Sequence, residues 1–115
     1  MSDAPRTLVL DPYRGNAAAA WRIVDASKLA QDLALEADVA IVGTGAGGGT
    51  AAEIFAQAGL SVVLVEEGAL KSSSEFRMRE SEAYPELYQE SAARKTKDKA
   101  VNILQGRCVG GGTTV

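Results

Sequence analysis

The chain contains no histidine, and this absence limits the chemistry that its own side chains can perform. Histidine is the side chain most often used for general acid–base catalysis near neutral pH, because its ordinary pKa lies close to that range. No other residue stands out as a catalytic base. The sequence therefore predicts no catalytic residue within these 115 residues, and it shows no pattern of metal ligands.

Cysteine, basic charge and long apolar runs are also scarce. The single cysteine, Cys108, excludes an intrachain disulfide and is typical of a reducing compartment. The 12 Lys and Arg residues are outnumbered by 15 Asp and Glu residues, so the net charge of -3 offers no basic surface for nucleic acid. No run is long enough to span a membrane, and no secretory signal is visible. We therefore expect a cytoplasmic protein of one domain at most.

The most informative stretch that is present covers residues 38–68. An apolar run at residues 39–42 leads into a glycine-rich turn with G-x-G-x-x-G spacing. An alanine-rich segment follows at residues 50–58, and a second apolar run at residues 62–65 ends on Glu66. Because strand, tight turn, helix, strand and acid follow in this order, the sequence predicts a parallel βαβ unit that binds a dinucleotide.

Each glycine of this turn has a physical reason in dinucleotide binding. Gly43 permits a sharp turn out of the strand, Gly45 leaves room for a pyrophosphate, and Gly48 lets the helix lie close to the strands. The helix N-terminus offers unpaired N–H groups and partial positive charge to the phosphates. Glu66 lies at the offset where a carboxylate accepts from an adenosine ribose hydroxyl, and it would repel the 2′-phosphate of NADP. We therefore expect an ADP-containing cofactor. The other turn residues assigned to it are Thr44, Ala46 and Gly47.

A second glycine-rich stretch closes the chain at residues 106–115, which read GRCVGGGTTV. Three consecutive glycines flanked by threonines suit close backbone approach to a flat or phosphorylated ligand, although such a run alone is also typical of a flexible tail. Cys108 has no lysine or histidine beside it to lower its pKa, so we expect a small buried hydrophobe. The cofactor candidates in this stretch are Gly106, Val109, Gly110, Gly111, Gly112 and Thr113.

The segment before the βαβ unit, residues 1–36, is predicted to be an irregular prelude. Residues 8–10 suggest a short strand, and residues 17–24 are helical by composition. Ser27 is a candidate N-cap for a short amphipathic helix over residues 28–35. Nothing in this prelude indicates chemistry.

The segment between the two glycine motifs changes composition sharply. Residues 69–99 are rich in charged and polar side chains, which predicts a solvated connection with a helical turn or two. Segments of this length without clear periodicity often cover a site. Residues 101–104 form a brief apolar run that predicts a strand or the approach to one.

The two motifs together resemble the glucose–methanol–choline (GMC) family of flavin-dependent oxidoreductases. Residues 42–48, VGTGAGG, together with Glu66 resemble its cofactor-binding turn and acid. Residues 106–115 are similar to its first signature, G-R-x-x-G-G-[GS]-[ST]. The resemblance covers about residues 38–115 and implies FAD rather than NAD, with Gly110 and its neighbours close to the flavin or its phosphate chain.

The resemblance also implies a function for a longer protein. Members of the family oxidise an alcohol by hydride transfer to the flavin, while a histidine takes the hydroxyl proton. The substrate domain and that histidine have no counterpart here. We therefore expect residues 37–115 to form a partial, Rossmann-like FAD-binding domain of the α/β class, incomplete without downstream chain. The whole would be the N-terminal piece of an alcohol oxidoreductase, inactive alone, and its small-molecule substrate would bind the complete enzyme.

Two other readings remain open. A stand-alone module that senses NAD or FAD without catalysis is favoured by the absent histidine and the short length, but not by the second glycine motif. A non-functional remnant would be unfolded or aggregated when expressed, and the uncharged, β-prone run at residues 62–65 would be its most aggregation-prone segment.

Overall fold

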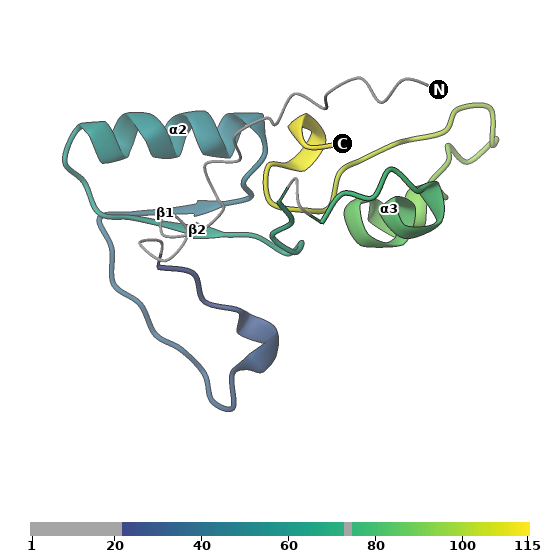
Figure 1. The fold of residues 1–115 in the computed structure, drawn as a ribbon. Helices are drawn as coiled ribbons and strands as arrows, with labels where there is room; N and C mark the ends of the chain where they lie inside the picture. Colours follow the sequence, from purple (N-terminus) through teal and green to yellow (C-terminus); the bar gives the residue numbers. More distant parts are fainter. Residues whose placement is uncertain (1–21, 73–74) are drawn as a thin grey trace, which may run out of the picture.

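The computed structural model describes residues 22–72 and 75–115, and its centre is a parallel two-stranded sheet. Strand β1 (Val39–Val42) pairs in register with strand β2 (Val62–Val65). Helix α2 (Ala46–Gln57) connects the strands and lies across one face of the sheet (Figure 1). The β-branched residues of both strands fit the extended backbone. The predicted βαβ unit, and with it a partial Rossmann-like α/β fold, is confirmed.

Helix α2 begins earlier than its sequence pattern predicts. Its first residue is Ala46, with Gly45 as N-cap, so three glycines at residues 47–49 lie inside the helix. Glycine is a poor helix former, and for this reason composition alone places the start near residue 50. The helix ends at Gln57, close to the expected end, and Gly59 follows with a φ of +85°. The N-terminal extension brings the helix start to the glycine-rich turn.

The predicted helix over residues 28–35 is wrong. The structure has a one-turn 3₁₀ helix, η1 (Ala26–Lys28), followed by an irregular loop. Asp25 rather than Ser27 caps it, since the Asp25 carboxylate accepts from the Ser27 N–H at 3.1 Å and from its hydroxyl at 2.6 Å. A short amphipathic helix is stable only when its apolar face packs against something, and Leu29 here remains 43% exposed.

Two further predictions for the prelude concern residues near the start of the chain. The strand at residues 8–10 lies outside the described residues. Most of the predicted helix over residues 17–24 does so too, and its described part, residues 22–24, is not helical.

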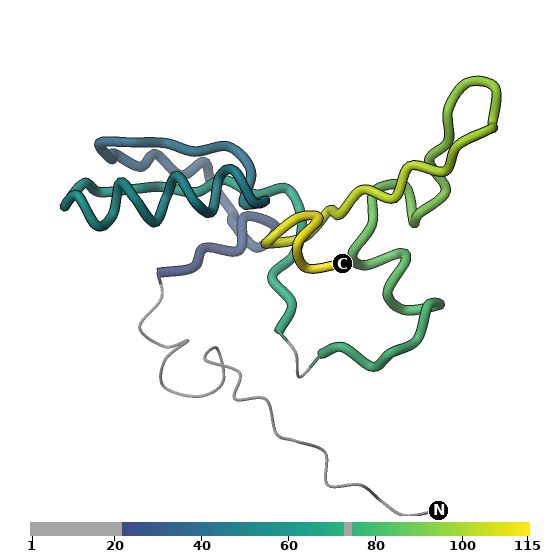
Figure 2. Tube along the Cα trace, turned by 90° about the horizontal axis from the view of Figure 1, so that it is seen from above, coloured from purple at the N-terminus to yellow at the C-terminus, as the bar shows by residue number. Residues whose placement is uncertain are grey.

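The connection after β2 contains the predicted helical turns, in helix α3 (Glu80–Leu87). The segment that follows, η2 (Gln89–Ala92), is irregular, because Glu90 and Ser91 have positive φ angles of 53° and 52°. The chain then projects as an arm before it returns toward the sheet (Figure 2). Residues 101–104 form no strand, although Asn102 makes an isolated antiparallel bridge with Lys95.

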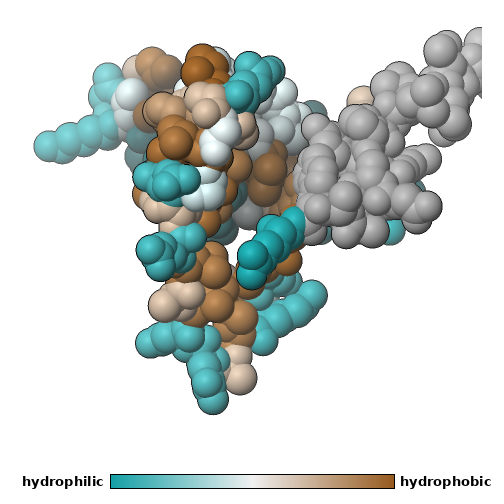
Figure 3. Space-filling view, turned by 90° about the vertical axis from the view of Figure 1, so that its left-hand side faces the viewer, coloured by the Kyte–Doolittle hydropathy of each residue, from teal (hydrophilic) through white to brown (hydrophobic). Residues whose placement is uncertain are grey.

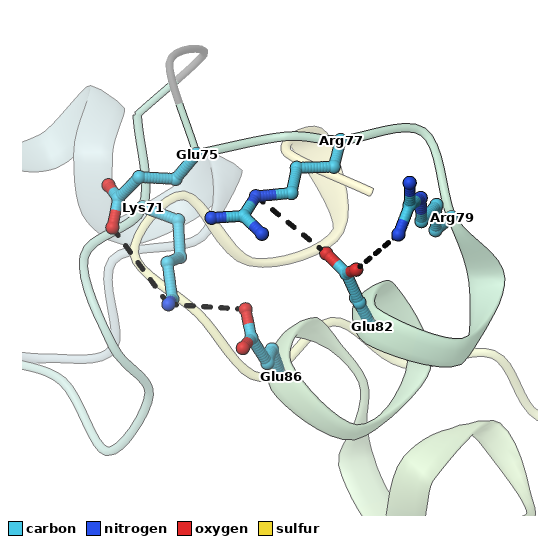
Figure 4. A network of polar contacts seen from close by, with 6 residues as sticks. All are labelled: Lys71, Glu75, Arg77, Arg79, Glu82 and Glu86. Carbon is cyan, nitrogen blue, oxygen red and sulfur yellow. Dashed lines mark hydrogen bonds and ion pairs between the residues drawn. The ribbon is translucent and has the colours of Figure 1, made fainter.

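Ion pairs join the loop after β2 to helix α3 (Figure 4). The Lys71 ammonium lies 3.1 Å from a Glu86 carboxylate oxygen and 3.9 Å from one of Glu75. Within the same region, Arg79 lies 3.4 Å from Glu82. Partly exposed pairs of this kind contribute about 0–1 kcal/mol each. They orient α3 weakly and do not replace an apolar core.

The described residues bury few apolar side chains. Among them, Leu87 and Cys108 are buried, at 8% and 1% exposure, whereas Val42 and Val65 at the strand ends remain 87% and 53% exposed. Figure 3 shows apolar side chains gathered on the end of the βαβ unit and along the loop that projects below it. Two parallel strands with so little cover are marginal by themselves. None of the helices in the described part of the chain is long and apolar enough to cross a membrane.

Candidate dinucleotide-binding site

The glycine-rich turn links strand β1 to helix α2 and lets the helix start lie close to the strand. Gly43 has a φ of +92°, a left-handed conformation that glycine adopts freely, and its N–H donates to the Val65 carbonyl at 2.7 Å. A Cβ on Gly48 would fall on the Gly43 carbonyl oxygen and 3.3 Å from the Ile41 side chain. The sharp turn at Gly43 and the close helix packing at Gly48 are therefore confirmed. A Cβ on Gly45 would meet no atom within 4 Å, so this side of the turn is accessible to a ligand.

The start of α2 presents backbone donors beside this accessible side. Gly45 is the N-cap, and as a glycine it has no side chain that could accept from the first N–H groups of the helix. The first helical hydrogen bond runs from the Gly49 N–H to the Gly45 carbonyl at 2.8 Å. The N–H groups before residue 49 have no partner one turn back along the helix. Together with the helix dipole they favour a phosphate oxygen.

Glu66 follows β2 and turns back to the glycine-rich turn. Its Oε2 accepts from the Thr44 N–H at 2.9 Å and from the Thr44 hydroxyl at 2.7 Å, while its Oε1 accepts from the Gly68 N–H at 2.9 Å. Burial raises the pKa of Glu66, but the hydrogen bonds from Gly68 and Thr44 outweigh it and hold that pKa below its usual value. Glu66 is therefore an ionised carboxylate at neutral pH, anchored from both sides.

The second glycine motif lies directly on the first. The Gly110 N–H donates to the Thr44 hydroxyl oxygen at 3.0 Å, and the Val109 N–H donates to the Ala69 carbonyl at 3.1 Å. A Cβ on Gly111 would lie 3.0 Å from the Gly45 Cα. The short helix η3 (Gly111–Thr113) contacts α2, as the adjacent ribbons in Figure 1 show. Tertiary structure therefore brings together two motifs that are far apart in sequence.

A groove of about 830 Å³ opens where the two motifs meet the strand ends. Its size is within the range of small-molecule sites. Six of the residues predicted from sequence line it: Gly43, Gly45, Glu66, Gly106, Gly111 and Gly112. The others form the helix start and the contact between the motifs: Thr44, Ala46, Gly47, Gly48, Val109, Gly110 and Thr113.

Sequence reasoning missed several residues of this groove. Val42 and Val65 are the last residues of their strands, and ligands of open parallel sheets bind outside the carboxyl ends of strands. That rule was the signal that could have identified them. Three residues directly before the second motif and one beside the acid also line the groove: Ile103, Leu104, Gln105 and Glu67. The described residues hold no cluster of ligands suited to a metal ion.

Cys108 belongs to the second motif and is buried, which confirms its predicted role as a small hydrophobe. Burial raises the pKa of its thiol, and the nearby Glu66 carboxylate raises it further. The sulfur lies 3.8 Å from the Gly111 carbonyl oxygen. The thiol therefore stays protonated and unreactive at neutral pH.

This burial predicts a slow reaction of Cys108 with alkylating reagents. In the native full-length protein, we expect labelling of this thiol by iodoacetamide to be at least about tenfold slower than in denaturant, because only local opening exposes it. Peptide mass spectrometry would measure the rate at Cys108 itself. Labelling at the same rate under native conditions would contradict the buried placement.

Comparison with known proteins finds an FAD binding domain model and several GMC-type relatives that match part of the chain. A family model described as an FAD binding domain matches residues 38–82. A long-chain-alcohol oxidase of Arabidopsis thaliana is 37% identical over 81 residues, covering 70% of this chain and 11% of the relative. An uncharacterised GMC-type oxidoreductase of Sinorhizobium fredii is 38% identical over 88 residues, covering 76% and 17%. Another from Mycobacterium tuberculosis is 42% identical over 81 residues, covering 69% and 13%.

No solved structure matches the chain. The chain spans only 11% to 17% of the length of these relatives, and the aligned region is their N-terminal part. Within that region lie the parallel βαβ unit, the glycine-rich turn and Glu66. By sequence, the chain is homologous to the N-terminal, FAD-binding region of the GMC-type oxidoreductases.

Proposed function

We propose that the chain is the N-terminal, FAD-binding part of a flavin-dependent alcohol oxidoreductase. The observation that carries the proposal is the contact between the two glycine motifs, in which the Gly110 N–H reaches the Thr44 hydroxyl at 3.0 Å. This contact holds the two glycine motifs side by side, and residues of both motifs line the groove at the strand ends. The match to an FAD binding domain over residues 38–82 supports FAD as the occupant.

The residues present fit this cofactor. The pyrophosphate would lie at the start of α2, where Gly45 leaves space and the first-turn N–H groups point outward. Hydrogen bonds to a charged group contribute about 1.5–3 kcal/mol each, so two or three would retain the cofactor firmly. Glu66 would accept from an adenosine ribose hydroxyl. Gly111 and Gly112 line the groove on its other side and would lie along the flavin or its phosphate chain.

Bound FAD would supply the hydride acceptor for oxidation of a CH–OH group. The names of the Arabidopsis relatives indicate long-chain alcohols for those enzymes, and an alcohol is accordingly the proposed substrate class for the complete protein here. The chain contains no histidine, so the proton-accepting residue would lie in the remainder of the enzyme. That remainder would also cover the exposed strand ends at Val42 and Val65. Residues 1–115 would then be inactive alone, and their cytoplasmic location stays a prediction.

Flavin retention in the full-length protein tests the proposal. Gly45→Val places a branched side chain where the pyrophosphate would lie, and we expect less than about a tenth of the wild-type flavin to remain after gel filtration. Glu66→Ala removes the ribose acceptor and should weaken flavin binding about tenfold. Gly49→Ala is the matched control, because its Cβ would meet only the Thr44 carbonyl oxygen, at an ordinary 3.8 Å. Unchanged flavin occupancy in both site variants would refute the proposal.

The second candidate is a stand-alone sensor of NAD or FAD, and the absence of histidine favours it. A sensor must fold and bind with one-to-one stoichiometry by itself. Titration of residues 1–115 with each dinucleotide, followed by calorimetry, separates the two functions. The proposed function predicts no stoichiometric binding, because so few apolar side chains in the described residues are buried. A non-functional remnant would likewise be unfolded or aggregated and would bind no dinucleotide. Flavin retention in the full-length protein therefore decides between the proposed function and a remnant.

A further inference from the structure

The hydroxyl of Thr44 lies between two groups from distant parts of the chain. Its oxygen is 2.7 Å from Glu66 Oε2 and 3.0 Å from the Gly110 nitrogen. A backbone N–H can only donate and an ionised carboxylate can only accept. The hydroxyl must therefore accept from Gly110 and donate to Glu66. The hydrogen bonds form one directed chain from the second glycine motif to the acid after β2.

The contact at Thr44 is not duplicated by the other hydrogen bonds of the second motif. Gly110 and Thr44 are 66 residues apart in sequence. Hydrogen bonds from the Thr113 hydroxyl and the Thr114 N–H remain within the motif. The Val109 N–H anchors the motif to Ala69 on the side of β2. Without the Thr44 hydroxyl, the motif would keep this anchor but would lose its hydrogen bond to the glycine-rich turn.

The Glu66 carboxylate strengthens the contact. A hydroxyl that donates to a charged acceptor is polarised, and its oxygen becomes a better acceptor for the next N–H. The Thr44 N–H donates to the same Oε2 at 2.9 Å, which fixes the rotamer of Glu66 relative to the turn. The acid thereby stabilises both motifs through one threonine.

We propose that Thr44 is a positioning residue whose hydroxyl holds the second glycine motif against the first, so that the pyrophosphate side and the flavin side of the groove form together. This inference rests on the proposed FAD function, but the contact itself exists without the cofactor. Thr44 does not line the groove, so its effect on FAD would act through Gly110 and Glu66.

Hydrogen exchange of the full-length protein, with and without added FAD, tests this role. Thr44→Val keeps the shape of the side chain but removes the hydroxyl, whereas Thr44→Ser keeps the hydroxyl and removes a methyl group. In Thr44→Val, we expect amides of residues 106–114 to exchange about tenfold faster, with unchanged exchange in β1 and β2. FAD should dissociate with a Kd about tenfold higher. Thr44→Ser should remain within about twofold of wild type in both measurements.

The outcomes separate the inference from the proposed function. Unchanged exchange in Thr44→Val, or equal loosening in Thr44→Ser, overturns the inference, because the hydroxyl would then not hold the motif. If Thr44→Val also loosens the strands, Thr44→Ala decides, because it removes the hydroxyl without putting a methyl group in its place: faster exchange at residues 106–114 supports the inference, and unchanged exchange overturns it. Loss of FAD in Gly45→Val with normal binding in Thr44→Val would keep the function and reject the inference. If Thr44→Val loosens residues 106–114 but the wild-type protein never binds FAD, the inference stands and the proposed function is rejected.

Discussion

Gly48→Ala is expected to destabilise the full-length protein by about 3 kcal/mol, at the upper end of overpacking effects. The added Cβ would fall on the Gly43 carbonyl oxygen and 3.3 Å from the Ile41 side chain. The Gly43 backbone cannot easily retreat, because its N–H is hydrogen-bonded to the Val65 carbonyl at 2.7 Å. Relief therefore requires α2 to move away from the sheet. Denaturant unfolding, followed by circular dichroism, would measure the loss.

The neighbouring glycine provides a control of opposite sign. Gly49→Ala places its Cβ 3.8 Å from the Thr44 carbonyl oxygen, an ordinary contact. Within a helix, replacing glycine by alanine stabilises by about 0.5–1 kcal/mol when no clash results. Two adjacent, chemically identical substitutions should therefore shift the unfolding midpoint in opposite directions. Equal midpoints for the two variants would contradict the close approach of α2 to β1.

Gly68→Ala is the second substitution with a large expected effect, about 2–3 kcal/mol of destabilisation. A Cβ at this position would meet the carbonyl group of Arg107 and the nitrogen of Cys108, all of them backbone atoms. The same crossing is held by an ion pair between Arg107 and Glu67 at 3.2 Å. The Gly68 N–H also donates to Glu66. The substitution should therefore displace the second motif and disturb the acid at once.

Exposure of the buried thiol reports this displacement directly. Cys108 is adjacent to the clash and 1% exposed, so we expect Gly68→Ala to accelerate its alkylation about tenfold or more under native conditions. Flavin retention should fall in parallel. Gly49→Ala, whose Cβ would meet only the Thr44 carbonyl oxygen within 4 Å, should leave the thiol protected. A protected thiol in Gly68→Ala would mean that the chain accommodates the extra atom without moving the second motif.

The sequence alone identified those parts of the fold that depend on the spacing of residues close together in the chain. The order of apolar runs and glycines predicted the βαβ unit, the turn at Gly43 and the close packing at Gly48, because each depends on residues near in sequence. The predicted helix over residues 28–35 is wrong, because its stability does not depend on nearby residues alone. Its apolar periodicity is local, but a short helix depends on a packing surface that the sequence does not reveal.

Tertiary structure alone decided how the two glycine motifs meet. Nothing in the sequence indicated that the Thr44 hydroxyl would join Glu66 to Gly110, or that Gly68 would need to be glycine. The offset of Glu66 predicts a ligand for ribose, whereas the structure shows its carboxylate accepting hydrogen bonds from Thr44 and Gly68. The Thr44–Glu66 hydrogen bond joins residues 22 positions apart, and the Gly110–Thr44 hydrogen bond joins residues 66 positions apart. Both form only when the sheet and the returning chain place the two partners within reach. Such contacts depend on the path of the backbone, which local residue patterns do not specify.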